Sequence, residues 1–155
     1  MTRLACDARE AFAEGGETPR IEIVSAEGSR GLGVRLLDAC SQGAVLGPIR
    51  GAVSGQISQH SIQIGPDQHL LDLDFVGYLL HSCAPNCVLD LKDMRVVALE
   101  DIDAHQFLTI DYAATEDRLY RQFACACGAP TCRGWVTGRR ETPDDDGARW
   151  LASLR

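Results

Sequence analysis

Three cysteines stand close together late in the chain and give the clearest sign of chemistry. Cys125 and Cys127 are separated by one residue, and Cys132 follows after four more. Gly128 and Pro130 lie between them and favour a turn, which would let the three thiolates converge on one ion. A structural zinc site is tetrahedral and needs a fourth ligand. The candidates are Cys6, Cys40, Cys83, Cys87 and the four histidines.

The alternative is that these cysteines are free thiols packed as small apolar groups. Buried cysteines rarely cluster in this way without a ligand, which favours the metal. The chain has seven cysteines, an odd number, and its first twelve residues lack the basic segment and apolar core of a secretory signal. We therefore expect no framework of structural disulfides and a cytoplasmic location.

The charge is negative and unevenly distributed. The chain carries 22 acids and 15 bases, a net charge of −7, which argues against binding nucleic acid through its phosphates. The sequence contains no run of 18 apolar residues, the length needed to span a membrane. The acidic segment, residues 67–117, holds eleven acids against two bases. If these acids share a face, they would attract a cationic partner; otherwise they form an ordinary solvated surface.

The elements that must position these residues are mostly short strands. A length of 155 residues suits one domain. Apolar runs broken by glycine predict strands at 21–24, 34–37, 44–49, 61–64, 69–71, 88–91, 95–99 and 107–110. Helical spacing predicts helices near the N-terminus, over 116–123, and within 143–155, where acids precede an apolar stripe. This pattern indicates a mainly β domain.

Four motifs in the expected order resemble those of SET-domain protein lysine methyltransferases. Residues 81–86, His-Ser-Cys-Ala-Pro-Asn, resemble the core of that family's longest motif, and residues 31–33 resemble its GxG motif. Residues 108–112 resemble the late motif that ends in Asp-Tyr. The cysteine run with the Arg-Gly after it resembles the zinc-binding post-SET segment. The ordered set covers about residues 21–135 and is far more specific than any one motif.

This resemblance implies a mainly β SET-domain fold of small curved sheets, with short flanking helices and a zinc-bound post-SET segment. The segment 81–86 and the strand before Tyr112 would form a C-terminal pseudoknot. The small size suggests a bacterial protein. The expected divisions are an N-terminal helical extension at 1–20, the SET domain at 21–123, the post-SET zinc segment at 124–136 and a C-terminal tail or helix at 137–155.

The resemblance also implies methyl transfer from S-adenosylmethionine to a lysine side chain in a basic protein, such as a histone-like or ribosomal protein. No direct contact with nucleic acid or membrane is expected. Tyr112 matches the catalytic tyrosine, and Ile110 would line the lysine channel with it. Cys83 would be the fourth ligand of a structural zinc ion, beside Cys125, Cys127 and Cys132, with Cys87 as its rival. The cofactor would contact Arg30, Gly31, Leu32, Gly33, Tyr78, Leu80, His81 and Trp135.

Some of these roles have structural alternatives. His81 would face the adenine through its backbone, and its ring could be satisfied inside the pseudoknot. Trp135 could cover the adenine or pack in the core. Asn86 is expected to brace the pseudoknot rather than to touch a ligand.

The sequence departs from the family pattern at three positions. Leu80 replaces an asparagine that helps to hold the cofactor, and Gly77 stands where arginine is frequent. Ile110 stands where many members carry Phe or Tyr, an aromatic that affects how many methyl groups are added. Two other functions therefore compete with an active enzyme. One is a SET-like domain that binds a basic peptide with little or no turnover, and the other is a zinc module whose cysteines sense redox state.

Overall fold

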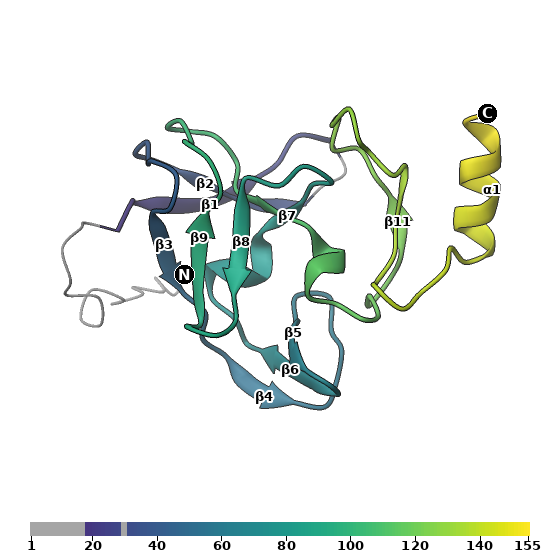
Figure 1. Ribbon diagram of the computed structural model, residues 1–155, viewed down its shortest axis with the longest axis horizontal. Helices are drawn as coiled ribbons and strands as arrows, with labels where there is room; N and C mark the ends of the chain where they lie inside the picture. The colour runs from purple at the N-terminus through teal and green to yellow at the C-terminus, as the bar shows by residue number, and fades with distance from the viewer. Residues whose placement is uncertain (1–17, 29–30) are drawn as a thin grey trace.

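The computed structural model describes residues 18–28 and 31–155 (Figure 1). The predicted N-terminal helix, Cys6 and Arg30 lie outside these residues. Within the described part, strands of two to five residues dominate and one α-helix is present. The predicted mainly β fold is therefore confirmed. The divisions expected at 20, 123 and 136 stay predictions.

Short antiparallel sheets make up most of the molecule. Their strands are rich in valine, leucine and isoleucine, which suit a pleated, half-buried surface. Register shifts between Val45 and Gly47 and between Gln63 and Gly65 bend two of the sheets. In spatial order the strands are β1 (Ile21–Ser25) and β2 (Leu32–Leu36); β3 (Val45–Pro48), β9 (Arg95–Ala98) and β8 (Cys87–Asp90); and β4 (Ala52–Ser54), β6 (Gln68–Leu71) and β5 (Ile62–Gly65).

A parallel pair joins two segments that are far apart in the sequence. β7 (Leu80–His81) follows the 3-10 helix η2 (Phe75–Tyr78) and pairs with β10 (Thr109–Ile110). Asn86 braces this pair, because its amide donates to the Phe107 carbonyl at 2.9 Å and its Oδ1 accepts from the Thr109 N–H at 2.8 Å. These are the two segments that the resemblance assigned to the pseudoknot.

The hydrophobic core lies between the sheets and η2. Apolar side chains that are less than 2% exposed fill it and so fix the distances between the sheets. They are Val34, Leu36, Leu46, Val76, Val96, Ile102 and Leu108, together with the thiol of Cys87.

The helix predicted over 116–123 is wrong. A 3-10 helix, η3 (Tyr112–Ala114), comes earlier, and the segment after it is irregular. Gln63 on β5 explains the difference. Its N–H donates to Glu116 Oε1 at 2.8 Å, and its side chain exchanges hydrogen bonds with Asp117. These contacts with β5 take the place of the local pattern that a helix would need.

The C-terminal part forms a separate layer beside the sheets. β11 (Phe123–Ala124) pairs with β12 (Trp135–Val136), and α1 (Asp145–Ser153) lies next to them (Figure 1). Asp144 caps α1 by accepting from the Gly147 N–H at 2.8 Å, which confirms the predicted helix. Within the described residues, no helix has the length and apolar character needed to cross a membrane. The cytoplasmic location and bacterial origin stay predictions.

Candidate functional site

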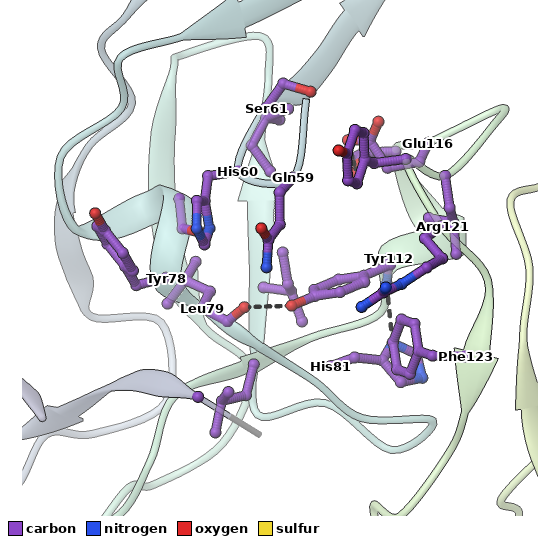
Figure 2. A pocket seen from close by; sticks show the side chains of 18 of the residues that line it. Gln59, His60, Ser61, Tyr78, Leu79, His81, Tyr112, Glu116, Arg121 and Phe123 are labelled. Atoms are coloured by element: carbon purple, nitrogen blue, oxygen red, sulfur yellow. Dashed lines mark hydrogen bonds between the residues drawn. The ribbon is translucent and has the colours of Figure 1, made fainter. Parts of the chain in front are cut away.

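A cavity of about 660 Å³ lies where η2, β7, η3 and β11 meet (Figure 2). Its size is in the range of small-molecule sites. Seven of the residues singled out in the sequence for cofactor or lysine binding line it: Gly31, Leu32, Tyr78, Leu80, His81, Ile110 and Tyr112. Gly33 and Trp135 do not line it, and the roles assigned from the sequence stay predictions.

Tyr112 points its hydroxyl across the cavity toward the end of η2 (Figure 2). The hydroxyl donates to the Leu79 carbonyl at 2.7 Å. Burial, helped by the charge of Glu116, raises the pKa of Tyr112 to about 12, so the phenol stays neutral at physiological pH. With its proton held by Leu79, the oxygen presents lone pairs to the cavity. Tyr112 can therefore orient a substrate but cannot act as a phenolate base.

His81 fixes the backbone of Tyr112. Its Nδ1 accepts from the Tyr112 N–H at 3.2 Å, and the two rings meet edge to face with centroids 5.1 Å apart. Burial lowers the pKa of His81 to about 4, so the ring is neutral. Its Nε2 lies 3.5 Å from Cys83 Sγ and 3.4 Å from Arg133 Nη2, so both ring nitrogens have polar neighbours. The His81 ring is thus satisfied inside the fold.

The two glycines of the GxG motif have different environments. Gly31 has a φ of +71°, and an added Cβ would meet nothing within 4 Å, so its backbone is open to the cavity. Gly33 packs instead against the interior. A Cβ there would lie 2.9 Å from the Phe107 ring and 3.0 Å from Leu80, which leaves no room for a side chain. Gly33 therefore allows β2 to approach β7 closely.

The departures from the family pattern lie along one wall of this cavity. Leu80 is 7% exposed and offers no hydrogen bond to a ligand. At Gly77 an added Cβ would come within 3.3 Å of His60, whose Nδ1 lies 2.9 Å from the Gly77 carbonyl. The His60 ring in turn lies 4.9 Å from the ring of Tyr78. His60 therefore packs closely against the position where the arginine is frequent.

Trp135 lies away from the cavity, between β11 and α1. Its indole N–H donates to Gln122 Oε1 at 2.9 Å. Its ring packs against Gly147 of α1, where any side chain would collide with it. The structure thus places Trp135 in a packing position.

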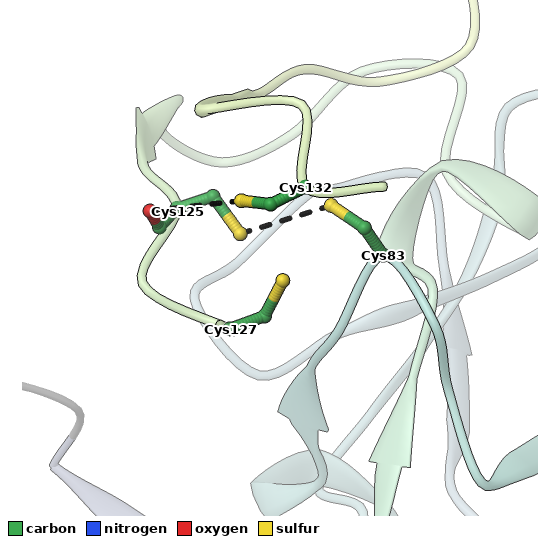
Figure 3. A group of neighbouring side chains, drawn as sticks. All are labelled: Cys83, Cys125, Cys127 and Cys132. Atoms are coloured by element: carbon green, nitrogen blue, oxygen red, sulfur yellow. Dashed lines mark hydrogen bonds between the residues drawn. The ribbon is translucent and has the colours of Figure 1, made fainter. Parts of the chain in front are cut away.

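The four cysteines predicted as metal ligands converge in space (Figure 3). The sulfur atoms of Cys83, Cys125, Cys127 and Cys132 all lie within 4.8 Å of one another. Cys87, the rival for the fourth place, is not part of this group and lies in the core, where burial raises the pKa of its thiol to about 12. Burial also raises the pKa of Cys125. Burial opposes ionisation of Cys127 too, but backbone N–H groups and neighbouring thiols lower its pKa to about 6.

Arg133 connects the cysteine cluster to the turn that carries Tyr112. Its backbone N–H and its Nε both donate to Cys83 Sγ at 3.4 Å. Its guanidinium pairs with Asp111 Oδ1 at 2.6 Å, and the same carboxylate oxygen accepts from the Ala113 N–H in η3. Donors of this kind stabilise a thiolate ligand and hold it in place. The sequence reasoning missed this role, although Arg133 directly follows the last cysteine.

Glu116 was also missed, since no motif marks it as a site residue. It lines the same cavity as Tyr112 and is 6% exposed. Burial raises its pKa from 4.5 to about 7. Its Oε1 accepts from Gln63 N–H and from the Thr115 hydroxyl. The site therefore contains a carboxyl that changes charge near neutral pH.

Glu116→Gln is expected to alter the pH dependence of stability. A raised carboxyl pKa gives stability that is complete below the unfolded pKa of 4.5 and is lost as the pH rises through about 7. The variant keeps an acceptor for Gln63 but cannot ionise. The difference in the free energy of unfolding, variant minus wild type, should therefore rise by about 2 kcal/mol from about pH 5 to about pH 8. Urea unfolding at both pH values measures this, and a constant difference would contradict it.

Comparison with known proteins relates the chain to one family. The family model described as SET domain matches residues 50–113. The histone-lysine N-methyltransferase trr of Drosophila melanogaster is 37% identical over 65 residues, which are 38% of this chain and 3% of that protein. The methyltransferase flvH of Aspergillus flavus is 28% identical over 110 residues, 69% of this chain and 62% of that protein. The chain thus spans less than two thirds of either relative.

Solved structures agree with the sequence matches. KRYPTONITE, in complex with mCHG DNA and SAH, superimposes with a TM-score of 0.61 and 28% identity over 76% of this chain and 29% of that one. The same protein has been solved with an H3(1-15) peptide, mCHH DNA and SAH. The DNA in these complexes is bound by a much longer chain, and the expectation of no nucleic-acid contact here stays a prediction.

Proposed function

Since the SET-domain family model matches residues 50–113, we propose that this chain transfers a methyl group from S-adenosylmethionine to the side-chain amine of a lysine in a basic protein. The observation that carries the proposal is the placement of Tyr112. Its hydroxyl is fixed by Leu79 inside a cavity that the GxG backbone and the cysteine segment also line. The relatives named as histone-lysine methyltransferases support this reaction.

The cavity fits the cofactor in size and in the character of its walls. It is large enough for a small molecule, and the open backbone at Gly31 allows a ligand to approach where a side chain would obstruct it. Phe123 and the residues from Ala124 to Cys127 form the opposite wall. Bound S-adenosylmethionine would supply a methyl group activated by its positive sulfur. Because Leu80 has no polar side-chain atoms, backbone atoms and other residues would have to bind the polar groups of the cofactor.

The chain's own residues would prepare the lysine for attack. A free lysine has a pKa of about 10.4, and only the neutral amine is a nucleophile. Burial between Tyr112, Ile110 and Tyr78 favours the neutral form. The amine lone pair then forms the nitrogen–carbon bond as the carbon–sulfur bond breaks, and the methylated ammonium gives its extra proton to water. Tyr112 aligns the amine through its hydroxyl oxygen.

The cysteine cluster would hold zinc as a structural ion. Four thiolates within 4.8 Å suit a tetrahedral zinc site. Cys83 comes two residues after β7, and the other three come from the segment between β11 and β12. A metal here would fasten that segment, which is too short for a core of its own, to the centre of the fold. Its role would be to complete the cavity wall rather than to take part in methyl transfer.

The acidic segment contributes less to substrate attraction than its composition suggested. Four of its eleven acids pair with arginine: Asp90 and Asp93 with Arg95, Asp111 with Arg133, and Asp117 with Arg139 and Arg140. Of the eleven, Glu116 alone lines the cavity. We therefore propose a basic substrate recognised mainly at short range.

Salt is accordingly expected to have a small effect on activity toward a basic peptide. At saturating cofactor, kcat/KM should change by less than about threefold between about 50 and 500 mM NaCl, because few unpaired charges face the site. Steady-state kinetics over this range would test it. A tenfold or larger fall would show that the acidic segment does steer the substrate.

A SET-like domain that binds a basic peptide without turnover is the second candidate, and Leu80 is the observation that favours it. Incubation with labelled S-adenosylmethionine and a lysate of the source organism separates the two. Label on a protein, located at lysine by mass spectrometry, supports the enzyme. Cofactor binding without label on any protein supports the binding domain.

A further inference from the structure

The C-terminal helix α1 makes contacts that converge on one residue of the cysteine segment, Gly134. The indole N–H of Trp150 donates to the Gly134 carbonyl at 3.0 Å. Leu151 and Leu154 cover the same residue, since an added Cβ at Gly134 would lie 3.2–3.3 Å from their methyl groups. Gly134 has a φ of +77°, a conformation that side chains rarely adopt. The end of α1 is thus fitted to this position.

Gly134 in turn touches two of the four cysteines. Its N–H points at Cys132 Sγ, 3.4 Å away, and its carbonyl accepts from the Cys125 N–H at 2.9 Å. The Gly134 carbonyl is therefore shared between a backbone N–H of the cluster and the indole of Trp150. A shift of Gly134 would move a donor to one ligand sulfur and the backbone of another ligand together.

A second set of contacts fixes α1 at its N-terminal end. Gln122 Oε1 accepts from the Trp135 indole and from the Asp144 N–H, both at 2.9 Å, and its amide donates to the Thr142 carbonyl at 3.0 Å. The Trp135 ring fills the space left by the missing side chain of Gly147. Both ends of α1 are therefore attached to the strands that flank the cysteine segment.

We infer that α1 is a clasp that sets the geometry and metal affinity of the cysteine cluster, with Trp150 as the positioning residue that acts through Gly134. The inference rests on the proposed function only in that the cluster binds a metal. It gives a role to α1, none of whose residues is among those that line the cavity. Hydrogen-bond donors around metal ligands typically alter affinity by about 10- to 100-fold.

The test compares Trp150→Phe with the wild type in the full chain. The variant keeps the ring but loses the indole N–H, and zinc affinity, measured by competition with a chromophoric chelator, should fall about tenfold. In the cobalt-loaded protein, the visible bands of the tetrahedral site should shift. Arg149→Ala is the matched control, because among the described residues that exposed neighbour forms an ion pair only with Asp146, and its loss should leave both readouts unchanged.

Gly147→Ala provides an independent variant, since its methyl group would displace Trp135 at the other end of α1. Lower zinc affinity and altered cobalt bands in both variants would support the clasp. Wild-type affinity and bands in Trp150→Phe would overturn it, even if that variant melts at a lower temperature. If the wild-type chain binds neither zinc nor cobalt, the metal site is wrong and the clasp is wrong with it. Thermal melts of the same proteins show whether such a loss of binding comes instead from misfolding.

Discussion

Tyr112→Phe is expected to lower kcat by about 100-fold or more while the dissociation constant for S-adenosylmethionine stays within about threefold. The hydroxyl donates to Leu79 and stays neutral because its pKa is raised to about 12. Its removal takes the aligning oxygen from the cavity and leaves the Leu79 carbonyl without that donor. The aromatic contacts of the ring with His81 and Phe123 remain, so the fold should survive.

Single-turnover methylation of a basic peptide, with calorimetry for cofactor binding, measures these two effects separately. Tyr120→Phe is the matched control, because Tyr120 lines the same cavity but is 63% exposed. This variant also loses a tyrosine hydroxyl, but not the one that is bonded to Leu79, so it should retain most of its activity. Near-normal kcat in Tyr112→Phe would remove this tyrosine from the catalytic step.

Removal of zinc by a strong chelator is expected to weaken S-adenosylmethionine binding by about tenfold or more and to abolish most activity. The reason lies in the position of the cluster. Residues 123–127 form a wall of the cavity, and Arg133 links Cys83 to Asp111 beside Tyr112. Loss of the ion would leave the wall free to move and would weaken the link between the cluster and η3.

Calorimetry with stripped and reloaded protein measures the change, and Cys83→Ser should reproduce it without a chelator. Cys40→Ser is the control, because Cys40 is a partly buried thiol outside the cluster. Equal cofactor affinity before and after complete stripping would show that the metal does not support the cavity.

The parts of the fold that could be predicted from sequence are those set by local patterns. The apolar runs at 88–91 and 95–99 predicted the strands of the β8–β9 hairpin, where Asp90 pairs with Arg95 across the strands. Acids before an apolar stripe predicted α1, and Asp144 is its cap. Such signals depend only on neighbouring residues, so they can be seen without knowledge of the rest of the chain.

The parts that could not be predicted depend on contacts distant in sequence. β7, β11 and β12 contain two residues each, too few to show periodicity, and exist only through their partners. β10 is equally short, but it lies within the strand predicted at 107–110. The environment of Glu116 could not be predicted for the same reason, because it depends on Gln63, which lies on β5 and is distant in sequence.

The candidate site divides in a similar way. Tyr112 and the cysteines could be assigned because ordered motifs mark them, and the structure brings all four cysteines together with Cys83 as the fourth. Trp135 could not be placed, because its position depends on how α1 docks and on the space at Gly147. The role of Arg133 required the distance from Cys83 to Asp111, which no spacing in the sequence reveals.

The parallel pair of β7 and β10 has a consequence for the order in which the protein is made and folded. Strands of two residues cannot form a stable pair alone. The pairing of β7 with β10 must therefore follow formation of the β8–β9 hairpin, which lies between these two strands in sequence and brings them together. The β1–β2 and β4–β6–β5 sheets leave the ribosome first, whereas residues 123–136, with three of the four cysteines, leave later. A nascent or shortened chain that ends before residue 123 would therefore possess sheets without a finished cavity, and cofactor binding would require residues 123–136.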